Sequence, residues 1–197
     1  MFTLGLTGGS GAGKGYVSKI FERYGIHSLD TDMVSRKVCM PGEPCLDELR
    51  EAFGDRIIRE DGTLDRRGLA AIAFADHEKL NTLNRITHHY ILADCRAWLR
   101  ERERAGDYAA IIDAPQLYES RFDRNCDYVI AVLAEKETRI ARILERDGIT
   151  REAAEARIAK QYDDNFFRDR AHFLVYQNEE NRADLQVDLI VQQIRWV

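Results

Sequence analysis

Seven residues near the start of the chain, Gly8 to Lys14, combine glycines with a lysine at a spacing that suits phosphate binding. Gly8 is followed by four residues and then by Gly13-Lys14, which is the phosphate-loop pattern through its lysine. Glycines permit left-handed backbone, so consecutive N–H groups can turn toward a phosphate, and the following helix adds its positive end. Lys14 supplies a mobile charge for the β and γ oxygens of a nucleotide. The alternative is a glycine-rich turn without a ligand.

The next residue, Gly15, departs from this pattern, because a Ser or Thr hydroxyl at that position normally coordinates Mg²⁺. Without the hydroxyl, either the metal is held through water and carboxylates or the affinity for Mg²⁺ is weak. We expect the former, because Mg²⁺ commonly keeps several waters. Asp113 ends the apolar run Ile111-Ile112 and is the best substitute ligand, acting through water. A strand-end turn acid that binds no metal is the alternative reading of Asp113.

Two further acids, Asp30 and Asp32, flank Thr31 at the end of a predicted second strand. Ligands of open parallel sheets bind at the carboxyl ends of strands, and alternate residues of a strand share a face. Asp32 is our candidate for the base that orients a hydroxyl and accepts its proton, a role that phosphoryl transfer allows to an ordinary carboxylate. Asp30 is assigned a structural or metal-supporting role. The alternative is an Asx turn that caps the next helix.

Arg139, Arg142 and Arg146 lie at i, i+3 and i+7, so a helix places them on one face. Guanidinium groups on a lid stabilise a transferring phosphate and exclude water. A solvated face with Arg–Glu pairs is the alternative. His77 and His89 are read as satisfied or exposed histidines, because no carboxylate accompanies them at zinc-site spacing.

The elements that must position these groups are short apolar runs alternating with helical patterns, which is typical of a parallel sheet with crossover helices. We predict an α/β fold, a single P-loop NTPase-like kinase domain over 1–197 with a five-stranded parallel sheet flanked by helices. Its core is 1–32, 105–134 and 171–197. A helical substrate-binding insertion covers 33–104, and a helical lid of two helices, broken at Gly148 with Thr150 as N-cap, covers 135–170. The strands are expected at Phe2–Thr7, Gly25–Asp30, Tyr108–Asp113, Tyr128–Leu133 and His172–Gln177.

Three helices can be predicted from apolar spacing. Val17, Ile20, Phe21 and Tyr24 form one stripe, with Gly25 as the stop. Leu46, Leu49 and Phe53 form a second stripe that Gly54 closes, and a long helical pattern runs from about His77 to Arg104.

Composition excludes several classes of protein. Lys and Arg number 29 against 34 Asp and Glu, for a net charge of −5, which argues against a broad nucleic-acid surface. The sequence contains no run of 18 apolar residues, so we expect no membrane-spanning helix. The first residues pass straight into a predicted strand, so we expect no export signal. The four cysteines lack metal-ligand spacing and are read as reduced, structural thiols. These features favour a cytoplasmic protein.

Taken together, the motifs resemble the dephospho-coenzyme A kinase family along nearly the whole chain. The matching segments are Gly5 to Lys14, Asp30-Thr31-Asp32 with Arg36, Pro41 to Pro44, Asp61 to Arg66, Leu83-Asn84 with His88, Pro115 to Glu119, Glu137 to Asp147, and Asn178 after the last strand.

The resemblance implies ATP-dependent phosphorylation of the ribose 3′-hydroxyl of dephospho-coenzyme A, the final step of coenzyme A synthesis, with ATP and Mg²⁺ as cofactors. It implies that Asp32 is the catalytic base, with Lys14 and Arg142 also catalytic. The small molecules ATP and dephospho-coenzyme A are the expected partners of a monomer or weak homo-oligomer, without nucleic acid or membrane. ATP contacts are expected at Gly8, Gly11, Ala12, Gly13, Lys14, Gly15, Tyr16 and Arg146, and substrate contacts at Asp32, Arg36, His88, Pro115 and Leu117.

The sequence departs from the family pattern at three places: Gly15-Tyr16 replaces the usual Ser/Thr-Thr, His89 replaces the proline after His88, and Gln116 lies within the Pro-Leu-Leu segment. The first departure affects magnesium geometry and the others affect substrate packing. Two other functions are weighed: another nucleoside or nucleotide kinase with the same fold, and a nucleotide-binding regulatory module without turnover, which Gly15 keeps open.

Overall fold

A computed structural model describes residues 1–177 and 182–195, so Asn178 lies outside the described residues. The chain divides into two compact units, Met1–Leu29 with Glu101–Val197, and Asp30–Arg100. The assignments of 33–104 to a substrate-binding insertion and of 135–170 to a lid stay predictions.

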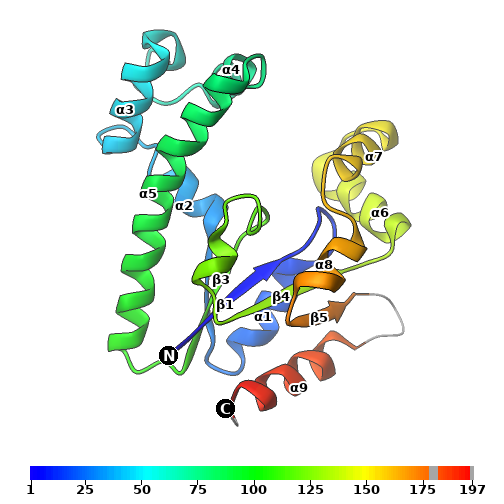
Figure 1. Cartoon of the computed structure of the whole chain (residues 1–197). Coiled ribbons are helices and arrows are strands. Elements are labelled where there is room, and N and C mark those ends of the chain that lie inside the picture. Colours follow the sequence, from blue (N-terminus) through cyan, green and yellow to red (C-terminus); the bar gives the residue numbers. More distant parts are fainter. Residues whose placement is uncertain (178–181, 196–197) are drawn as a thin grey trace. The chain divides into compact units, whose positions relative to one another are not determined.

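The first unit is built on five parallel strands in the order β2-β3-β1-β4-β5 (Figure 1). The predicted α/β fold class is therefore confirmed. Three strands are shorter than predicted, and β2 begins at His27 because Gly25 adopts a left-handed φ of 74° in the turn that follows the first helix. The strands are β1 (Phe2–Thr7), β2 (His27–Asp30), β3 (Ala109–Asp113), β4 (Tyr128–Leu133) and β5 (Phe173–Tyr176).

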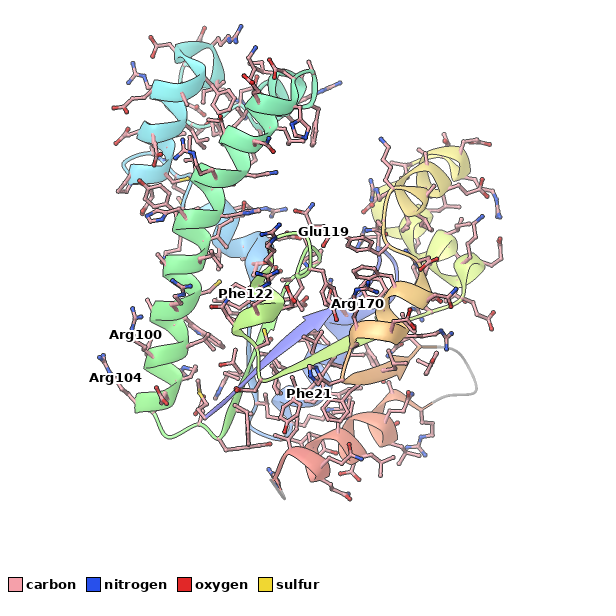
Figure 2. The ribbon with its side chains drawn as sticks, in the orientation of Figure 1. Phe21, Arg100, Arg104, Glu119, Phe122 and Arg170 are labelled. Atoms are coloured by element: carbon pink, nitrogen blue, oxygen red, sulfur yellow. The ribbon has the colours of Figure 1, made fainter. Side chains whose placement is uncertain are left out.

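Helices cover both faces of this sheet. Alternate residues of a strand point to opposite faces, and in β4 Ile130 and Val132 pack with α1 (Lys14–Glu22) and α9 (Ala183–Arg195). The intervening residues, Ala131 and Leu133, pack with Phe167 of α8 (Asp164–Arg170). The apolar stripe predicted for the first helix is confirmed, since Val17, Ile20 and Phe21 are buried in this core. Figure 2 labels Phe21 among them.

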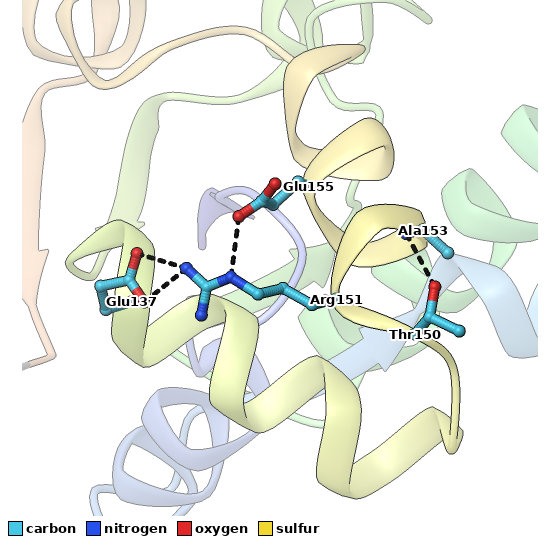
Figure 3. A network of polar contacts seen from close by, with 5 residues as sticks. All are labelled: Glu137, Thr150, Arg151, Ala153 and Glu155. Atoms are coloured by element: carbon cyan, nitrogen blue, oxygen red, sulfur yellow. Dashed lines mark hydrogen bonds and ion pairs between the residues drawn. The ribbon is translucent and has the colours of Figure 1, made fainter.

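The 135–170 segment contains three helices, so the prediction of two is wrong. The break at Gly148 and the N-cap at Thr150 between α6 (Lys136–Asp147) and α7 (Arg151–Ala159) are confirmed (Figure 3). The third helix is α8. Its start was missed because it rests on a cap, with the Asp163 carboxylate accepting from the Phe166 N–H at 2.8 Å, rather than on apolar periodicity.

The second unit consists mainly of helices. The predicted stripe of Leu46, Leu49 and Phe53 is buried in α3 and ends at Gly54, as expected. The long predicted helix is confirmed as α5, His77–Arg104, whose last four residues extend into the first unit. No helix among the described residues is both long and apolar enough to span a membrane. The elements here are α2 (Thr31–Lys37), α3 (Pro44–Phe53), η1 (Asp55–Ile57), α4 (Arg66–Phe74) and α5, while η2 (Phe122–Asn125) belongs to the first unit.

Candidate active site

The glycine-rich loop between β1 and α1 has the backbone that a phosphate cradle requires. Gly8, Gly11 and Gly13 all have positive φ, at 143°, 78° and 98°. A Cβ on Gly8 would lie 2.3 Å from the carbonyl oxygen of Val132, so this position has no room for a residue with a side chain. Gly13 is the N-cap of α1 and has no side chain to accept from the first-turn N–H groups. The positive end of α1 is therefore open to an anion.

Lys14, the first residue of α1, forms an ion pair with Asp113, the last residue of β3. Its Nζ lies 3.4 Å from Asp113 Oδ1, and the two side chains are 17% and 14% exposed. The pair forms because β3 runs beside β1, with Asp113 in register with Leu6 just before the loop. The two predicted residues thus meet at the carboxyl end of the sheet. A triphosphate would offer Lys14 a stronger partner than one carboxylate.

Helix α6 packs directly on the loop through two of the three predicted arginines. Arg139 Nε donates to the carbonyl oxygen of Ser10 at 3.0 Å, and Arg142 Nη1 donates to those of Gly11 and Ala12 at 3.2 and 3.3 Å. Because their carbonyl oxygens are held by guanidinium groups, these loop residues are fixed in orientation. Arg139 is only 6% exposed, and burial lowers its pKa.

Gln161, a residue that the sequence analysis missed, completes this contact. Its Oε1 accepts from the Ser10 N–H at 2.9 Å and from Arg139 Nη2 at 3.0 Å. Gln161 follows α7 and is 151 residues from Ser10, so no local pattern could have indicated the contact. The Arg139–Gln161 pair ties the 135–170 segment to the loop.

Arg146 lies on the same helix but does not join this contact. Its guanidinium pairs with the neighbouring Asp147 at 2.7 and 2.9 Å, and its side chain is 60% exposed. Hydrogen bonds from Arg146 and Arg157 lower the pKa of Asp147. Nearby, Arg151 binds Glu137 and Glu155 (Figure 3). The solvated ion-pair alternative therefore describes Arg146, but not Arg139 or Arg142.

Asp30 and Asp32, the two acids at the end of the second strand, do not both have the predicted positions. Only Asp30 belongs to β2, and its Oδ1 accepts from the Asp32 N–H at 2.8 Å, which caps α2. Asp32 lies in the first turn of α2, so the prediction that both acids share one strand face is wrong. The alternative reading of Asp30 as a helix cap is confirmed. Asp32 and Arg36 are both exposed on α2.

The remaining predicted substrate residues fall into two groups. His88 is half-buried on α5, and desolvation by burial lowers its pKa. Pro115 is partly exposed. Leu117 is fully buried, and a Cβ on Gly5 would lie 2.8 Å from its Cδ2. This side chain therefore packs in the core against Gly5, and a substrate contact at Leu117 stays a prediction.

Aromatic residues join the segment after β3 to the 135–170 segment. Tyr162 stacks on Phe166 with ring centroids 3.6 Å apart, and Tyr118 meets Phe166 edge-on at 5.2 Å. The Arg170 guanidinium lies 4.2 Å from the Phe166 ring centroid. Burial raises the pKa of Tyr118 to about 12. These contacts hold α8 beside the Pro115-to-Glu119 segment.

The described residues contain no group of three or more His, Cys, Asp or Glu side chains that could hold a metal ion. Mg²⁺ is commonly bound by one or two carboxylates plus substrate phosphates, so it does not require such a group. Asp113 offers one such carboxylate. Gly15 offers none, and a Cβ added there would meet nothing within 4 Å.

A parallel sheet, a phosphate loop with its lysine, and arginines fixed on that loop define a phosphate-loop kinase. The family model for dephospho-CoA kinase matches residues 2–184. The chain belongs to the dephospho-CoA kinase family.

Individual relatives agree with this assignment. A dephospho-CoA kinase of Corynebacterium glutamicum is 40% identical over 188 residues, covering 95% of this chain and 94% of that protein. A Thermus thermophilus crystal structure has 26% identity and a TM-score of 0.82, covering 100% of this chain and 98% of that one. A Campylobacter jejuni dephospho-CoA kinase, at 24% identity and a TM-score of 0.71, covers 98% and 96% and shares the fold.

Proposed function

We propose that this chain transfers the γ-phosphoryl group of ATP to the ribose 3′-hydroxyl of dephospho-coenzyme A, completing coenzyme A. The observation that carries the proposal is the phosphate loop, with left-handed glycines and the Lys14–Asp113 pair, in a chain of this family. Cytoplasmic location and a monomeric or weakly associating state stay predictions from the sequence.

ATP binds with its phosphates on the loop residues from Gly8 to Tyr16. Lys14 exchanges Asp113 for the β and γ oxygens, and Arg142, 3.2 Å from the Gly11 carbonyl oxygen, adds positive charge beside the loop. These groups stabilise charge on the transferring phosphoryl group, which is the main requirement of a loose transition state. Asp113, released from Lys14, would hold Mg²⁺ through water. When bound, Mg²⁺ neutralises phosphate charge.

Asp32 orients the acceptor hydroxyl and takes its proton. The carboxylate is exposed on the first turn of α2, and the Asp30 cap fixes where that helix begins. Phosphoryl transfer asks mainly for orientation and late proton acceptance, so an exposed carboxylate suffices. Arg36, one turn further on the same helix, and His88 are proposed to bind the substrate.

Asp32→Asn tests this role, with Asp30→Asn as the matched control. A lost general base costs ~10²–10⁴-fold in rate, so Asp32→Asn should lower kcat by at least about a hundredfold while ATP affinity changes little. Asn is as good an N-cap as Asp, so Asp30→Asn should retain most of the turnover. The assay follows 3′-phosphorylated product from dephospho-coenzyme A, ATP and Mg²⁺. Full turnover in Asp32→Asn would remove that residue from the base role.

A second function, a nucleotide-binding module without turnover, is favoured by one observation, the missing hydroxyl at Gly15. The same assay separates the two proposals. Tight ATP binding with no product from dephospho-coenzyme A identifies the module. Product from a nucleoside or nucleotide but not from dephospho-coenzyme A identifies another kinase.

A further inference from the structure

Two cysteines in the second unit lie in contact and belong to no part of the proposed kinase site. Cys39 follows the end of α2, and Cys45 is the second residue of α3. Their Sγ atoms are 3.8 Å apart and share a hydrogen bond. The turn between them, in which the Glu43 N–H donates to the Met40 carbonyl oxygen at 3.1 Å, brings the two thiols together.

A guanidinium group lies beside this thiol pair. Arg66, the first residue of α4, donates from Nη2 to the carbonyl oxygens of Ser35 and Arg36 at 3.1 and 3.4 Å, in the last part of α2. It also interacts with the Cys39 thiol. Cations next to a thiol favour the thiolate, which is the reactive form.

The electrostatics separate the roles of the two sulfurs. The hydrogen bond from Cys45, assisted by Arg66, lowers the pKa of Cys39 to about 7 against the opposing effect of burial. The same contact, burial and the nearby Glu48 carboxylate raise the pKa of Cys45. Cys39 is also slightly more accessible, at 4% exposed against 0%. Cys39 is therefore the attacking sulfur and Cys45 the second one.

We infer that Cys39 and Cys45 form a redox-reactive pair that a hydroperoxide converts into a disulfide. The Cys39 thiolate attacks the terminal peroxide oxygen, which breaks the O–O bond, releases the alcohol or water, and leaves a sulfenic acid. The Cys45 sulfur then attacks the Cys39 sulfur, and water leaves. In sum, two thiols and one hydroperoxide give one disulfide, one alcohol (or water) and one water.

Hydrogen peroxide treatment of the full chain at pH 7, followed by non-reducing peptide mapping, tests the inference. We expect one cross-link, between the peptides of Cys39 and Cys45, with the mass of two hydrogens lost. Cys95→Ser is the matched control and should give the same cross-link, because Cys95 is fully buried and burial raises its pKa to about 12. Cys45→Ser should stop at a sulfenic acid on Cys39, which dimedone traps.

Arg66→Gln tests the electrostatic part. Arg66 contributes to lowering the pKa of Cys39, so its loss should lower the thiolate fraction and slow the oxidation at pH 7. The peptide map of the peroxide-treated wild-type chain tests the disulfide itself, even where a variant fails to fold. Four free thiols after treatment, or oxidation of Cys95 or Cys126 before Cys39, would overturn the inference.

The expected effect of the disulfide on turnover rests on the proposed function. Helix α2, which ends just before Cys39, also carries Asp32 and Arg36. We expect the cross-linked chain to lose at least half of its kcat and dithiothreitol to restore it. The cross-link is read by mass without substrate, so an inactive kinase and an unreactive thiol pair give different results. Unchanged turnover in a fully cross-linked chain would overturn this regulatory effect.

Discussion

Replacing Gly11 by Ala tests how tightly the phosphate loop packs on α6. A Cβ at Gly11, whose φ is 78°, would lie 2.5 Å from the carbonyl oxygen of Arg139 and 2.9 Å from its Cα. Both neighbours are backbone atoms, so no side-chain rotation relieves the contact. A left-handed backbone costs an Ala ~1–2 kcal/mol, and overpacking costs a further ~1–3 kcal/mol.

Together these costs amount to about 3 kcal/mol of lost stability. In a chain of this length each kcal/mol lowers Tm by ~2–4 °C, so we expect Gly11→Ala to melt about 6–12 °C below the wild type. Displacement of the loop should also weaken ATP binding by about tenfold, the equivalent of one lost hydrogen bond. Thermal denaturation followed by circular dichroism and calorimetric ATP titration measure the two effects.

Gly15→Ala is the matched control four residues away. A Cβ at Gly15 meets nothing within 4 Å, and the residue lies in the first turn of α1. Ala is favoured over Gly in a helix by up to ~1 kcal/mol, so this variant should melt at or slightly above the wild-type temperature. A wild-type Tm for Gly11→Ala, or an equal loss in both variants, would refute the packing argument.

Three further predictions concern the loop and the 135–170 segment. Gly15→Ser supplies the missing hydroxyl without a clash, so turnover should saturate at lower Mg²⁺; an unchanged activation curve would show that the hydroxyl is irrelevant. Asp147→Asn removes a carboxylate whose pKa is lowered by Arg146, so its contribution to stability is present at neutral pH and lost as the pH falls below ~4. Melting curves of variant and wild type should therefore differ at pH 7 and converge in acid; a constant difference contradicts the linkage. Thr150→Ala loses the cap on Ala153 and about 1 kcal/mol of stability, whereas Thr150→Ser should retain it, as urea unfolding will show.

The sequence was sufficient for features that depend on local backbone and periodicity. The phosphate loop could be predicted because its backbone has positive φ at Gly8, Gly11 and Gly13, and glycine is the residue that adopts positive φ readily. The long helix α5 was predicted with its full bounds, His77–Arg104, because apolar spacing continues through it and Gly106 follows.

Features that depend on contacts far along the chain were missed. Gln161 reaches Ser10 across 151 residues, and nothing in either neighbourhood indicates the partner. Leu117 was assigned to the substrate because its segment resembles that of the family, and its full burial against Gly5 could not be predicted from the sequence. Asp32 was expected to share a strand face with Asp30. Instead, the Asp30 side chain caps a helix that begins at the next residue, so the strand does not continue to Asp32.

The buried Arg139 imposes different evolutionary constraints on two glycines of the loop. A Cβ on Gly9 would lie 2.1 Å from Arg139 Nη2, a side-chain atom, whereas the obstacle at Gly11 is the main chain of Arg139. A shorter residue at position 139 would therefore make room for a side chain at position 9, but not at position 11. Positions 9 and 139 should show strong epistasis, while glycine at position 11 is required whatever residue occupies position 139.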